Sequence, residues 1–581
     1  MKALLVYPEM PPTYWSFRYA LPFIGRKASL PPLGLLTVAA LLPEDWDVSL
    51  LDMNVEPLSE EAVAGADIVL TSSMLIQQAS HSEVVRVCRE HGTPVVAGGP
   101  FPTASWRSIE GVDHFVLNEA EVTLPRFLQD LDKGRAEHVY EDDARPDLAD
   151  SPPPRFDLVR RKAYSSMAVQ FSRGCPHSCE FCDIIELFGR RPRTKTPAQL
   201  VEEMEILYRE GWRGSLFVVD DNFIGNRKQV RLLLREVADW QRQREYPFSL
   251  FTEATLGLAE DEALMGQMVE AGFNMVFLGL ETPDPCTLAA VGKSQNLRSD
   301  MLAGVHRIQA RGMEVSGGFI LGFDDDPEDI FDRQIEFIQS AAIPTAMVGL
   351  LNALPNTRLG RRLAEEGRLE GEATGNNTHD FRLNFVPRMD VRKLLSGYRR
   401  VLAELYRPDR YFDRCLQLLK VLQPHRTSHR RVRAAELRAA LLSVLRQSFS
   451  TYSWSYWRFL IRGFLTRPSM LAETVTMAVK GHHFFKMTKN VLEVDRFKQT
   501  LDRLAQAFEQ RAREVSQQEL KERVAELREY RDRVVARMRA RYRRLHADFR
   551  IYAEDAVAAF QNTLDELIAG IDAGMRPAPS V

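Results

Sequence analysis

Short apolar runs alternate with helical stretches through about the first 350 of the 581 residues, and this alternation constrains the fold most strongly. Short buried strands separated by helices are typical of parallel βαβ units. In the amino-terminal segment, 1–141, strands are predicted at 3–7, 48–51, 68–72, 95–97 and 114–117. The class is therefore α/β, and this segment is predicted to be a doubly wound, Rossmann-like domain, which binds ligands beyond the carboxyl ends of its strands.

Three loops at those strand ends carry residues suited to ligand binding. They hold Ser72 and Ser73, then Gly98, Gly99 and Pro100, and then Asn118 and Glu119. Glycine lets a backbone approach a large flat or phosphorylated ligand closely, although a plain tight turn is an equally good interpretation of the glycines. No G-x-G-x-x-G motif is present, so a nicotinamide dinucleotide site is not expected.

A second alternating pattern follows a proline-rich linker, predicted at 142–160, whose three successive prolines can neither continue a helix nor donate hydrogen bonds. Over 161–385, strands are predicted at 168–172, 215–219, 248–253, 275–280, 314–321 and 346–351. Six β/α units indicate a (β/α)6 partial TIM barrel with its chemistry at the carboxyl ends of the strands. The remainder is predicted to be all-α: a helical extension over 386–494, and long charged helices, as a hairpin or coiled coil, over 495–581.

Composition narrows the class of protein. The chain has 45% hydrophobic and 27% charged residues, a formal net charge of -3 and six cysteines, which excludes wholesale disorder and a disulfide scaffold. Near-neutral charge gives no general attraction to nucleic acid. The chain lacks a run of about 18 uncharged apolar residues and begins with too short an apolar run for a signal peptide, so a reduced, cytoplasmic location is expected. Cys88, Cys286 and Cys415 are expected to be buried thiols.

The other three cysteines, Cys175, Cys179 and Cys182, stand at the spacing C-x3-C-x2-C directly after a predicted barrel strand. Thiolates at this spacing are suited to zinc or to an iron–sulfur cluster. A structural zinc ion requires a fourth ligand, and the nearby candidate, His177, lies inside the first spacer. A cluster held by three thiolates leaves one iron open for a substrate or cofactor.

The motif resembles the radical S-adenosylmethionine (radical SAM) signature C-x3-C-x-Φ-C, with Phe181 at the aromatic position. The resemblance implies that the three cysteines hold a [4Fe–4S] cluster whose open iron binds S-adenosyl-L-methionine. Further matches stand at successive predicted strand ends, although 220–222 differ in residue type from the family and Asp325 replaces a glutamate. The implied residues for binding S-adenosylmethionine are Phe181, Asp220, Asp221, Asn222, Glu253, Glu281, Gly318, Ile320 and Gly322.

An α/β domain ahead of such a barrel resembles the cobalamin-binding subclass, whose P-P-L-G-L and G-G-P elements match 31–35 and 98–100. In the subclass element G-E-x-E, Asn118 replaces the glycine. The resemblance implies a cobalamin site formed by Ser72, Ser73, Gly98, Gly99, Pro100, Asn118 and Glu119. No D-x-H-x-x-G is present, so no histidine is nominated as an axial cobalt ligand.

Within this subclass, residues 1–490 most resemble the hopanoid C-2 methylase subgroup. This implies a methyltransferase that acts on an unactivated carbon of a lipid-like or secondary-metabolite substrate, with methylcobalamin as methyl donor and a flavodoxin- or ferredoxin-type electron donor. No residue is assigned a catalytic role. Three alternatives stay open: a cyclase, ring-rearranging or oxidative enzyme of the same subclass, a non-catalytic cobalamin or cluster sensor, and a zinc-stabilised interaction module.

Weaker signals lie in the carboxyl-terminal part. The segment 452–489 mixes aromatic and basic residues, which is typical of a helix in a membrane interface, here the inner membrane face, or of a helix packed on the barrel with its arginines extended. Nucleic-acid binding is not expected, since no recognisable fold supports it. His482 and His483 are expected to be structural, because adjacent residues of a helix point in different directions. The charged helices suggest self-association.

Overall fold

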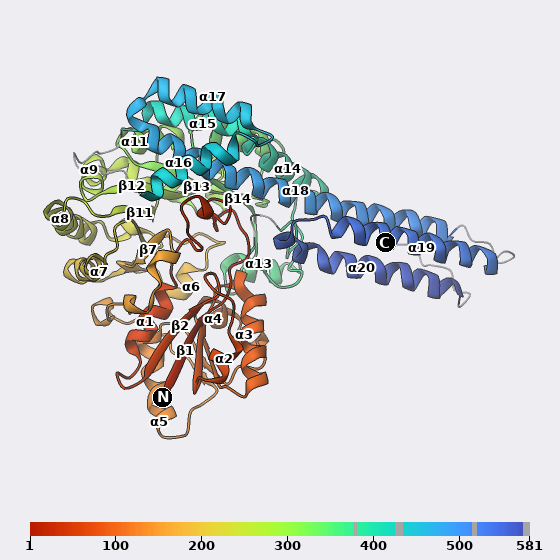
Figure 1. The fold of residues 1–581 in the computed structure, drawn as a ribbon, viewed down its shortest axis with the longest axis horizontal. Helices are drawn as coiled ribbons and strands as arrows, with labels where there is room; N and C mark the ends of the chain where they lie inside the picture. The colour runs from red at the N-terminus through yellow and green to blue at the C-terminus, as the bar shows by residue number, and fades with distance from the viewer. Residues whose placement is uncertain (377, 379, 424–433, 514–519, 573–581) are drawn as a thin grey trace. The chain divides into compact units, whose positions relative to one another are not determined.

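The computed structural model describes residues 1–376, 378, 380–423, 434–513 and 520–572. The chain divides into two compact units, Met1–Thr378 with Arg382–His483 and His379–Phe381 with Phe484–Val581. The first unit contains an amino-terminal sheet, a partial barrel and several helices (Figure 1). The second unit is helical.

The amino-terminal sheet has six parallel strands in the order β2-β1-β3-β4-β5-β6. The strands are β1 (Lys2–Tyr7), β2 (Asp47–Asp52), β3 (Ile68–Ser72), β4 (Val95–Gly98), β5 (His114–Val116) and β6 (Val139–Tyr140). The helices are α1 (Leu33–Leu41), α2 (Glu60–Ala64), α3 (Gln78–His91), α4 (Pro100–Ser105) and α5 (Ala120–Asp132). Because β1 pairs with both β2 and β3, the winding direction reverses there, which is the usual place for a ligand in such sheets.

Both faces of this sheet are covered, which confirms the doubly wound prediction. Buried side chains of α2 and α3, such as Val63 and Val84, pack on one face. Leu35 of α1 and Phe127 of α5 pack on the other. Two separate cores therefore hold the carboxyl ends of β3, β4 and β5 in fixed positions at one edge.

The second sheet also has six parallel strands, in the order β14-β13-β12-β11-β10-β7, and forms the predicted partial barrel. The strands are β7 (Ser166–Val169), β10 (Ser215–Val218), β11 (Ser249–Ala254), β12 (Phe273–Glu281), β13 (Glu314–Leu321) and β14 (Ala346–Leu350). The helices between them include α7 (Pro197–Arg209), α8 (Arg227–Gln243), α9 (Glu262–Glu270), α10 (Pro285–Ala290), α11 (Met301–Ala310) and α12 (Ile330–Ser340). Alternate residues of β11 are buried, as expected when one face packs on helices.

The first barrel strand differs from its predicted range, 168–172. β7 ends at Val169, and Ser172–Arg173 form a separate strand, β8, which pairs antiparallel with β9 (Arg193–Thr194). Asp220 causes this break, since its carboxylate accepts hydrogen bonds from Phe171 N (2.8 Å) and Ser172 Oγ (2.6 Å). The chain is thereby turned out of the sheet just before the cysteine motif.

Helices complete the first unit. They are α13 (Arg358–Glu365), α14 (Val391–Leu405), α15 (Pro408–Val421), α16 (Ala434–Gln447), α17 (Ser453–Thr466) and the first part of α18 (Leu471–Arg513). The fully buried Arg414 ties α15 to the barrel by donating to Ile343 O (2.6 Å). Residues 424–433 of the predicted 386–494 extension lie outside the described residues.

The second unit contains the rest of α18, α19 (Leu520–Tyr542) and α20 (Ala547–Asp572). Ring contacts between Phe508 and Tyr530 and between Phe497 and Tyr542 make α18 and α19 antiparallel. The pair Arg531–Asp565 joins α19 to α20 (2.8 Å). The predicted charged helices are thus present, and positions 514–519 and 573–581 of that prediction lie outside the described residues. Among the helices of the described ranges, none combines the length and the continuous apolar character that a membrane span requires.

Candidate active site

The cysteine loop leaves the sheet through a position that only glycine can occupy. Gly174 has a φ of +93°, and a Cβ atom there would lie 2.8 Å from Gly189 O. The amide of Gly174 donates to Asp221 Oδ2 (3.0 Å). Backbone conformation and this hydrogen bond together fix where the loop that carries the three cysteines begins.

Amide side chains face the thiols. Asn222 Nδ2 donates to Cys175 Sγ (3.9 Å), and Gln295 Nε2 donates to Cys179 Sγ (3.6 Å). Burial raises the pKa of the Cys175 and Cys182 thiols in the metal-free chain. No group of three His, Cys, Asp or Glu side chains in the described ranges converges on a single ion. A cubane cluster does not require such convergence, because each thiolate binds a different iron.

The predicted acidic run, 220–222, is brought to the loop, but its members have different partners. Asp220 is buried, and its carboxylate already accepts hydrogen bonds from the turn after β7. Burial raises the pKa of Asp220 to about 7. Asp221 holds the Gly174 amide, and burial raises its pKa to about 6. The buried Oδ1 of Asn222 has no hydrogen-bond partner among the described residues. Asn222 is therefore the member with an acceptor available for a ligand.

A buried ion pair, which the sequence reading missed, lies beside the loop. Lys293 Nζ donates to Glu281 Oε1 (2.6 Å) and lies 5.8 Å from the centre of the Phe181 ring. Burial alone would lower the pKa of Lys293, but Glu281 and the nearby thiols raise it above its ordinary value. Lys293 and Gln295 follow α10 in a loop without a recognisable motif, so only the fold reveals them.

The predicted Gly318, Ile320 and Gly322 lie at the end of β13. A Cβ atom on Gly318 would lie 2.8 Å from the Phe277 ring, and Gly322 has a φ of +102°. Ile320 packs in one apolar cluster with Phe181, so two predicted residues from distant segments are brought together. The turn after β13 is closed by Asp326 rather than Asp325, because Asp326 Oδ2 accepts from Gly322 N (2.8 Å).

Glu253 lies on the interior face of β11. Its carboxylate accepts no hydrogen bond from the described part of the chain, and burial, with the charges of Asp221 and Asp220, raises its pKa to about 8. The same face carries Phe251, whose ring stacks on Phe217 of β10 at 4.7 Å. The interior therefore holds a neutral carboxyl group above an aromatic wall.

The aromatic wall is continued by a residue of the amino-terminal segment. Trp15 lies between β1 and α1 in sequence, yet its ring packs edge-on against Phe277 of β12 at 5.0 Å. In Figure 1 this dark red segment reaches the barrel beside β13. Trp15 stays 42% exposed, so it leaves apolar surface open to a ligand. No motif predicted this contact, which joins the segment after β1 to a strand of the barrel.

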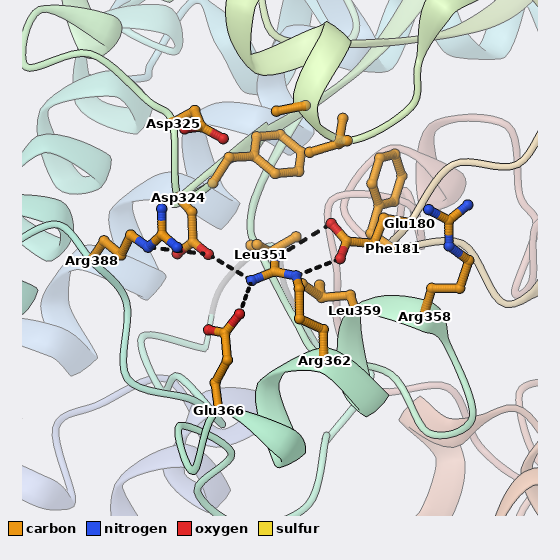
Figure 2. A pocket seen from close by; sticks show the side chains of 13 residues that line it. Glu180, Phe181, Asp324, Asp325, Leu351, Arg358, Leu359, Arg362, Glu366 and Arg388 are labelled. Atoms are coloured by element: carbon orange, nitrogen blue, oxygen red, sulfur yellow. Dashed lines mark hydrogen bonds and ion pairs between the residues drawn. The ribbon is translucent and has the colours of Figure 1, made fainter.

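A cavity of about 320 Å³ lies on the α13 side of Phe181 (Figure 2). In its wall, the Arg362 guanidinium donates to Glu180 (2.6 Å), Asp324 (3.0 Å) and Glu366 (3.0 Å). These ion pairs join the cysteine loop, the turn after β13 and α13. The pairing largely balances the charge of the cavity wall.

The glycines predicted for cobalamin are positions where a backbone approaches another chain segment closely. A Cβ atom on Gly98 would lie 2.7 Å from Val116 O. Gly99 has a φ of +88°, and a Cβ atom there would lie 2.3 Å from Ser72 Oγ. Pro100 begins α4 directly afterwards. Ser72, Gly98 and Gly99 therefore meet at one edge, formed by the carboxyl ends of β3 and β4.

Several buried polar atoms beside this edge have no hydrogen-bond partner among the described residues. They are Thr71 Oγ1, Ser73 Oγ and both ring nitrogens of His81. Burial lowers the pKa of His81 to about 4, so its ring is neutral. Buried polar atoms are normally paired. This edge is thus suited to a large ligand that supplies hydrogen-bonding groups of its own.

Asn118 and Glu119 behave differently from each other. Asn118 has a φ of +61°, a conformation that asparagine tolerates better than most residues, which explains how it replaces the glycine of the G-E-x-E element. Glu119 is buried beneath arginines of the barrel: Arg173 Nη1 donates to its Oε2 (2.9 Å) and Arg193 Nη2 to its Oε1 (2.7 Å). Its carboxylate is therefore already occupied by this contact.

Two further predictions have clear outcomes. Cys88 and Cys415 are buried as predicted, but the prediction that Cys286 is buried is wrong. Cys286 lies in the first turn of α10, whose inward side is filled by Thr287 and Leu288. The structural interpretation of the histidine pair is confirmed, since His482 Nδ1 lies 2.6 Å from Tyr452 Oη and His483 Nε2 lies 3.1 Å from Tyr14 O.

Comparisons with known proteins agree with this geometry. The B12 binding domain matches residues 24–128, the Radical SAM superfamily matches 169–338, and a domain of unknown function (DUF4070) matches 357–496. The chain is 41% identical over 491 residues to an uncharacterized methyltransferase of Synechocystis sp., covering 84% of this chain and 92% of the relative. It is 31% identical over 496 residues to the hopanoid C-2 methylase of Rhodopseudomonas palustris, covering 83% and 92%.

Solved structures share the fold. The radical S-adenosylmethionine methyltransferase TsrM of Kitasatospora setae, with cobalamin and a [4Fe–4S] cluster bound, matches with a TM-score of 0.53 at 17% identity, over 81% of this chain and 99% of that one. The cobalamin-dependent enzyme OxsB, with aqua-cobalamin bound, matches with a TM-score of 0.55 at 15% identity, over 84% of each chain.

A cobalamin-type α/β domain ahead of a partial barrel with three cysteines defines the radical SAM enzymes that bind cobalamin. The chain belongs to the family of cobalamin-dependent radical SAM methyltransferases that contains the hopanoid C-2 methylase. Its cofactors are a [4Fe–4S] cluster, S-adenosylmethionine and cobalamin. The residues present fit these groups, because unpartnered polar atoms and closely approached glycines lie at both expected sites.

Proposed function

We propose that this enzyme methylates an unactivated carbon of a lipid-like, polycyclic substrate. The observation that carries the proposal is the interior of the barrel, where Phe217, Phe251 and Phe277 form an apolar wall. Such a site suits a large apolar ligand with few polar groups. The relative of known substrate at 31% identity is a hopanoid methylase, which supports this class.

The cofactors supply the reductive cleavage that starts radical chemistry and the methyl group that is transferred. We propose that Cys175, Cys179 and Cys182 hold the cluster. Asn222 Oδ1 and Glu253 offer acceptors for the amino and hydroxyl groups of S-adenosylmethionine. Phe181, Gly318, Ile320 and Gly322 form an apolar surface with close backbone approach for its adenosine.

The other predicted carboxylates bind groups of the protein itself, and not the cofactor. Asp220 and Asp221 hold the start of the cysteine loop, and Glu281 orients Lys293 beside the thiols. We assign these three as positioning residues. An ammonium group buried next to a cluster favours the more negative, reduced state of that cluster.

For cobalamin, we propose that Ser72, Ser73, Gly98, Gly99 and Pro100 form the cradle, with Asn118 at its rim. The backbone can approach the ligand at Gly98 and Gly99, and the unpartnered hydroxyl of Ser73 supplies a hydrogen bond. Glu119 does not need to contact the ligand in this arrangement. It sets the position of the barrel arginines relative to the cradle.

We propose a flavodoxin- or ferredoxin-type electron donor and a cytoplasmic location, at the inner face of a membrane. Self-association through α18, α19 and α20 is a further part of the proposal. The exposed charged side chains of α19, for example Glu529 and Arg533, support an interaction role for these helices.

Anaerobic reconstitution tests the reaction. Protein with cluster, methylcobalamin, S-adenosylmethionine and a reduced flavodoxin or ferredoxin as electron donor should form 5′-deoxyadenosine and S-adenosylhomocysteine together over repeated turnovers when a lipid extract is added. If 5′-deoxyadenosine forms without S-adenosylhomocysteine, the result would contradict methyl transfer. It would favour a cyclase or another radical enzyme of the same subclass. The substrate class is tested by mass spectrometry of lipids from a deletion strain and its parent, where a missing methylated lipid is expected.

The cysteine variant Cys175→Ala separates an enzyme from a sensor. It should lose deoxyadenosine formation while keeping cobalamin, since the cradle lies on a different sheet. A Cys175→Ala variant that still forms deoxyadenosine and still retains cobalamin would contradict the assignment of Cys175 as a cluster ligand.

A further inference from the structure

Helix α17 has two apolar faces, and the first packs against other helices of the protein. Tyr456 and Phe459 are completely buried. The Phe459 ring stacks on Phe412 of α15, with ring centres 4.6 Å apart and an interplanar angle of 16°. This face fixes α17 to the helical part of the first unit, so the opposite face must point outward.

The second face of α17 is apolar and exposed. Its side chains have exposed fractions of 81% for Trp454, 40% for Trp457, 54% for Ile461, 50% for Phe464 and 73% for Leu465. Residues at this spacing share one side of a helix. A soluble monomer rarely leaves so many large apolar side chains together in water. These five side chains form the α17 face.

Exposed apolar residues continue on the preceding helix and turn. Phe449, in the turn between α16 and α17, is 88% exposed. On α16, Leu437 is 64% exposed and Leu441 is 61% exposed, and they stand four residues apart on one side of the helix. Both helices therefore expose an apolar side.

The charges beside the α17 face are basic. Arg458 and Arg462 follow its edge with side chains 48% and 54% exposed. Their nearest acidic partner, Asp413 of α15, lies 3.8 Å and 4.0 Å away and is itself 47% exposed. Helix α17 contains no Asp or Glu. The surface thus combines tryptophan, aliphatic side chains and arginine.

We propose that the α17 face docks the enzyme on an anionic lipid bilayer. Tryptophan at an apolar edge and arginine beside it are the composition of helices that lie in the membrane interface, with the aromatic rings at headgroup depth and the guanidinium groups on lipid phosphates. A helix of 14 residues is too short to cross the bilayer, so it lies along the surface. A second copy of the chain fits less well, because pairing two α17 faces would bring their arginines together.

The inference deepens the proposed function, since it names the surface at which the enzyme meets lipids. The evidence for this surface is the exposure of the α17 side chains, which is independent of the reaction that the enzyme catalyses. Vesicle binding and methyl transfer can therefore fail separately. A Cys175→Ala variant should bind vesicles like the wild type while losing turnover.

Flotation of the full-length holoenzyme with vesicles tests the proposal. Phosphatidylglycerol-containing vesicles should bind the enzyme more tightly than pure phosphatidylcholine vesicles, and added salt should weaken binding. Ile461→Glu and Leu465→Glu should each lower the partition coefficient by about 10-fold or more. Arg458→Gln and Arg462→Gln should each lower binding to anionic vesicles by about fivefold, and leave binding to neutral vesicles unchanged.

Leu232→Glu is the matched control, because Leu232 on α8 is 43% exposed and far from α17 in sequence. It should leave vesicle binding unchanged. Trp454→Ser provides a milder variant if a glutamate variant does not fold, and circular dichroism checks folding. Equal binding by wild type and the Ile461→Glu variant would overturn the proposal. A concentration-dependent dimer that the glutamate variants dissociate, without vesicle binding by the wild type, would overturn it in favour of a contact between copies.

Discussion

Glu119 of the amino-terminal domain and Arg173 of the barrel form a buried ion pair, with Glu119 Oε2 and Arg173 Nη1 2.9 Å apart. Arg173 directly precedes Gly174 and the cysteine loop, while Glu119 directly precedes α5, in the short loop that follows β5. Arg173 also donates to Glu121 Oε1 (2.7 Å). The cradle proposed for cobalamin and the cysteine loop are therefore joined through one guanidinium group.

The first prediction concerns this pair. Glu119→Ala leaves Arg173 and Arg193 short of a buried partner, which should lower the free energy of unfolding by about 3–5 kcal/mol. Glu83→Ala, at an exposed pair with Arg86, is the control and should have no measurable effect. Chemical denaturation measures both. A Glu119 variant as stable as the control would contradict a structural role for the pair.

The second prediction concerns the amide donors at the thiols. Hydrogen bonds to cluster sulfur raise the reduction potential. Asn222→Leu should therefore lower the potential of the cluster, measured by titration with electron paramagnetic resonance, and reduce turnover by about 10- to 100-fold. Gln295→Leu should lower the potential in the same direction. It should leave S-adenosylmethionine affinity unchanged, whereas Asn222→Leu should weaken it.

An unchanged potential in both variants would show that the two amides do not contact the assembled cluster.

The third prediction uses two glycines with positive φ. Gly99→Ala places a Cβ atom 2.3 Å from Ser72 Oγ at a φ of +88°, so it should disturb the cradle and abolish cobalamin retention during gel filtration. Gly134→Ala is matched, because Gly134 has a φ of +66° and open space around it. Gly134→Ala should lose about 1–2 kcal/mol of stability from backbone strain, and Gly99→Ala should lose more, because Gly99 also has a ψ of -174°. Loss of cobalamin in both variants would mean that strain alone, and not the cradle, is responsible.

The fourth prediction follows from the raised pKa of Glu253, about 8 against an ordinary 4.5. Between these pH values the folded chain keeps a proton that the unfolded chain has released, so the free energy of unfolding falls as the pH rises. Glu253→Gln removes this loss. The stability of the cofactor-free variant relative to wild type should grow from near zero at pH about 4.5 to about 4 kcal/mol at pH about 8.

Denaturation at a series of pH values provides the measurement, and Glu365→Gln on the exposed side of α13 is the control. If the Glu253→Gln and control curves run parallel, the carboxyl is not protonated in the folded chain.

The strands and the residues at their ends could be predicted, because periodicity and glycine are local signals. Asn118 shows this well: its place in a G-E-x-E element is visible in sequence, and its φ of +61° explains the substitution. The partners of Glu119 could not be predicted, since they stand 54 and 74 residues away in the chain. The same holds for Asp220, whose carboxylate is occupied by a turn 48 and 49 residues earlier.

Lys293 and Gln295 were invisible for a different reason. They belong to a loop with no repeating pattern, and only the packing of the barrel brings them to the cysteines. Cys286 was placed wrongly because its hydrophobic character says nothing about which side of a short helix faces the core.

The contact between Trp15 and Phe277 gives the proposed substrate site walls from both the amino-terminal segment and the barrel. A barrel expressed without the amino-terminal segment would lack one wall, even with every cluster ligand in place. Exchanging the amino-terminal module between relatives should therefore transfer part of the substrate selectivity along with the methyl-donor site.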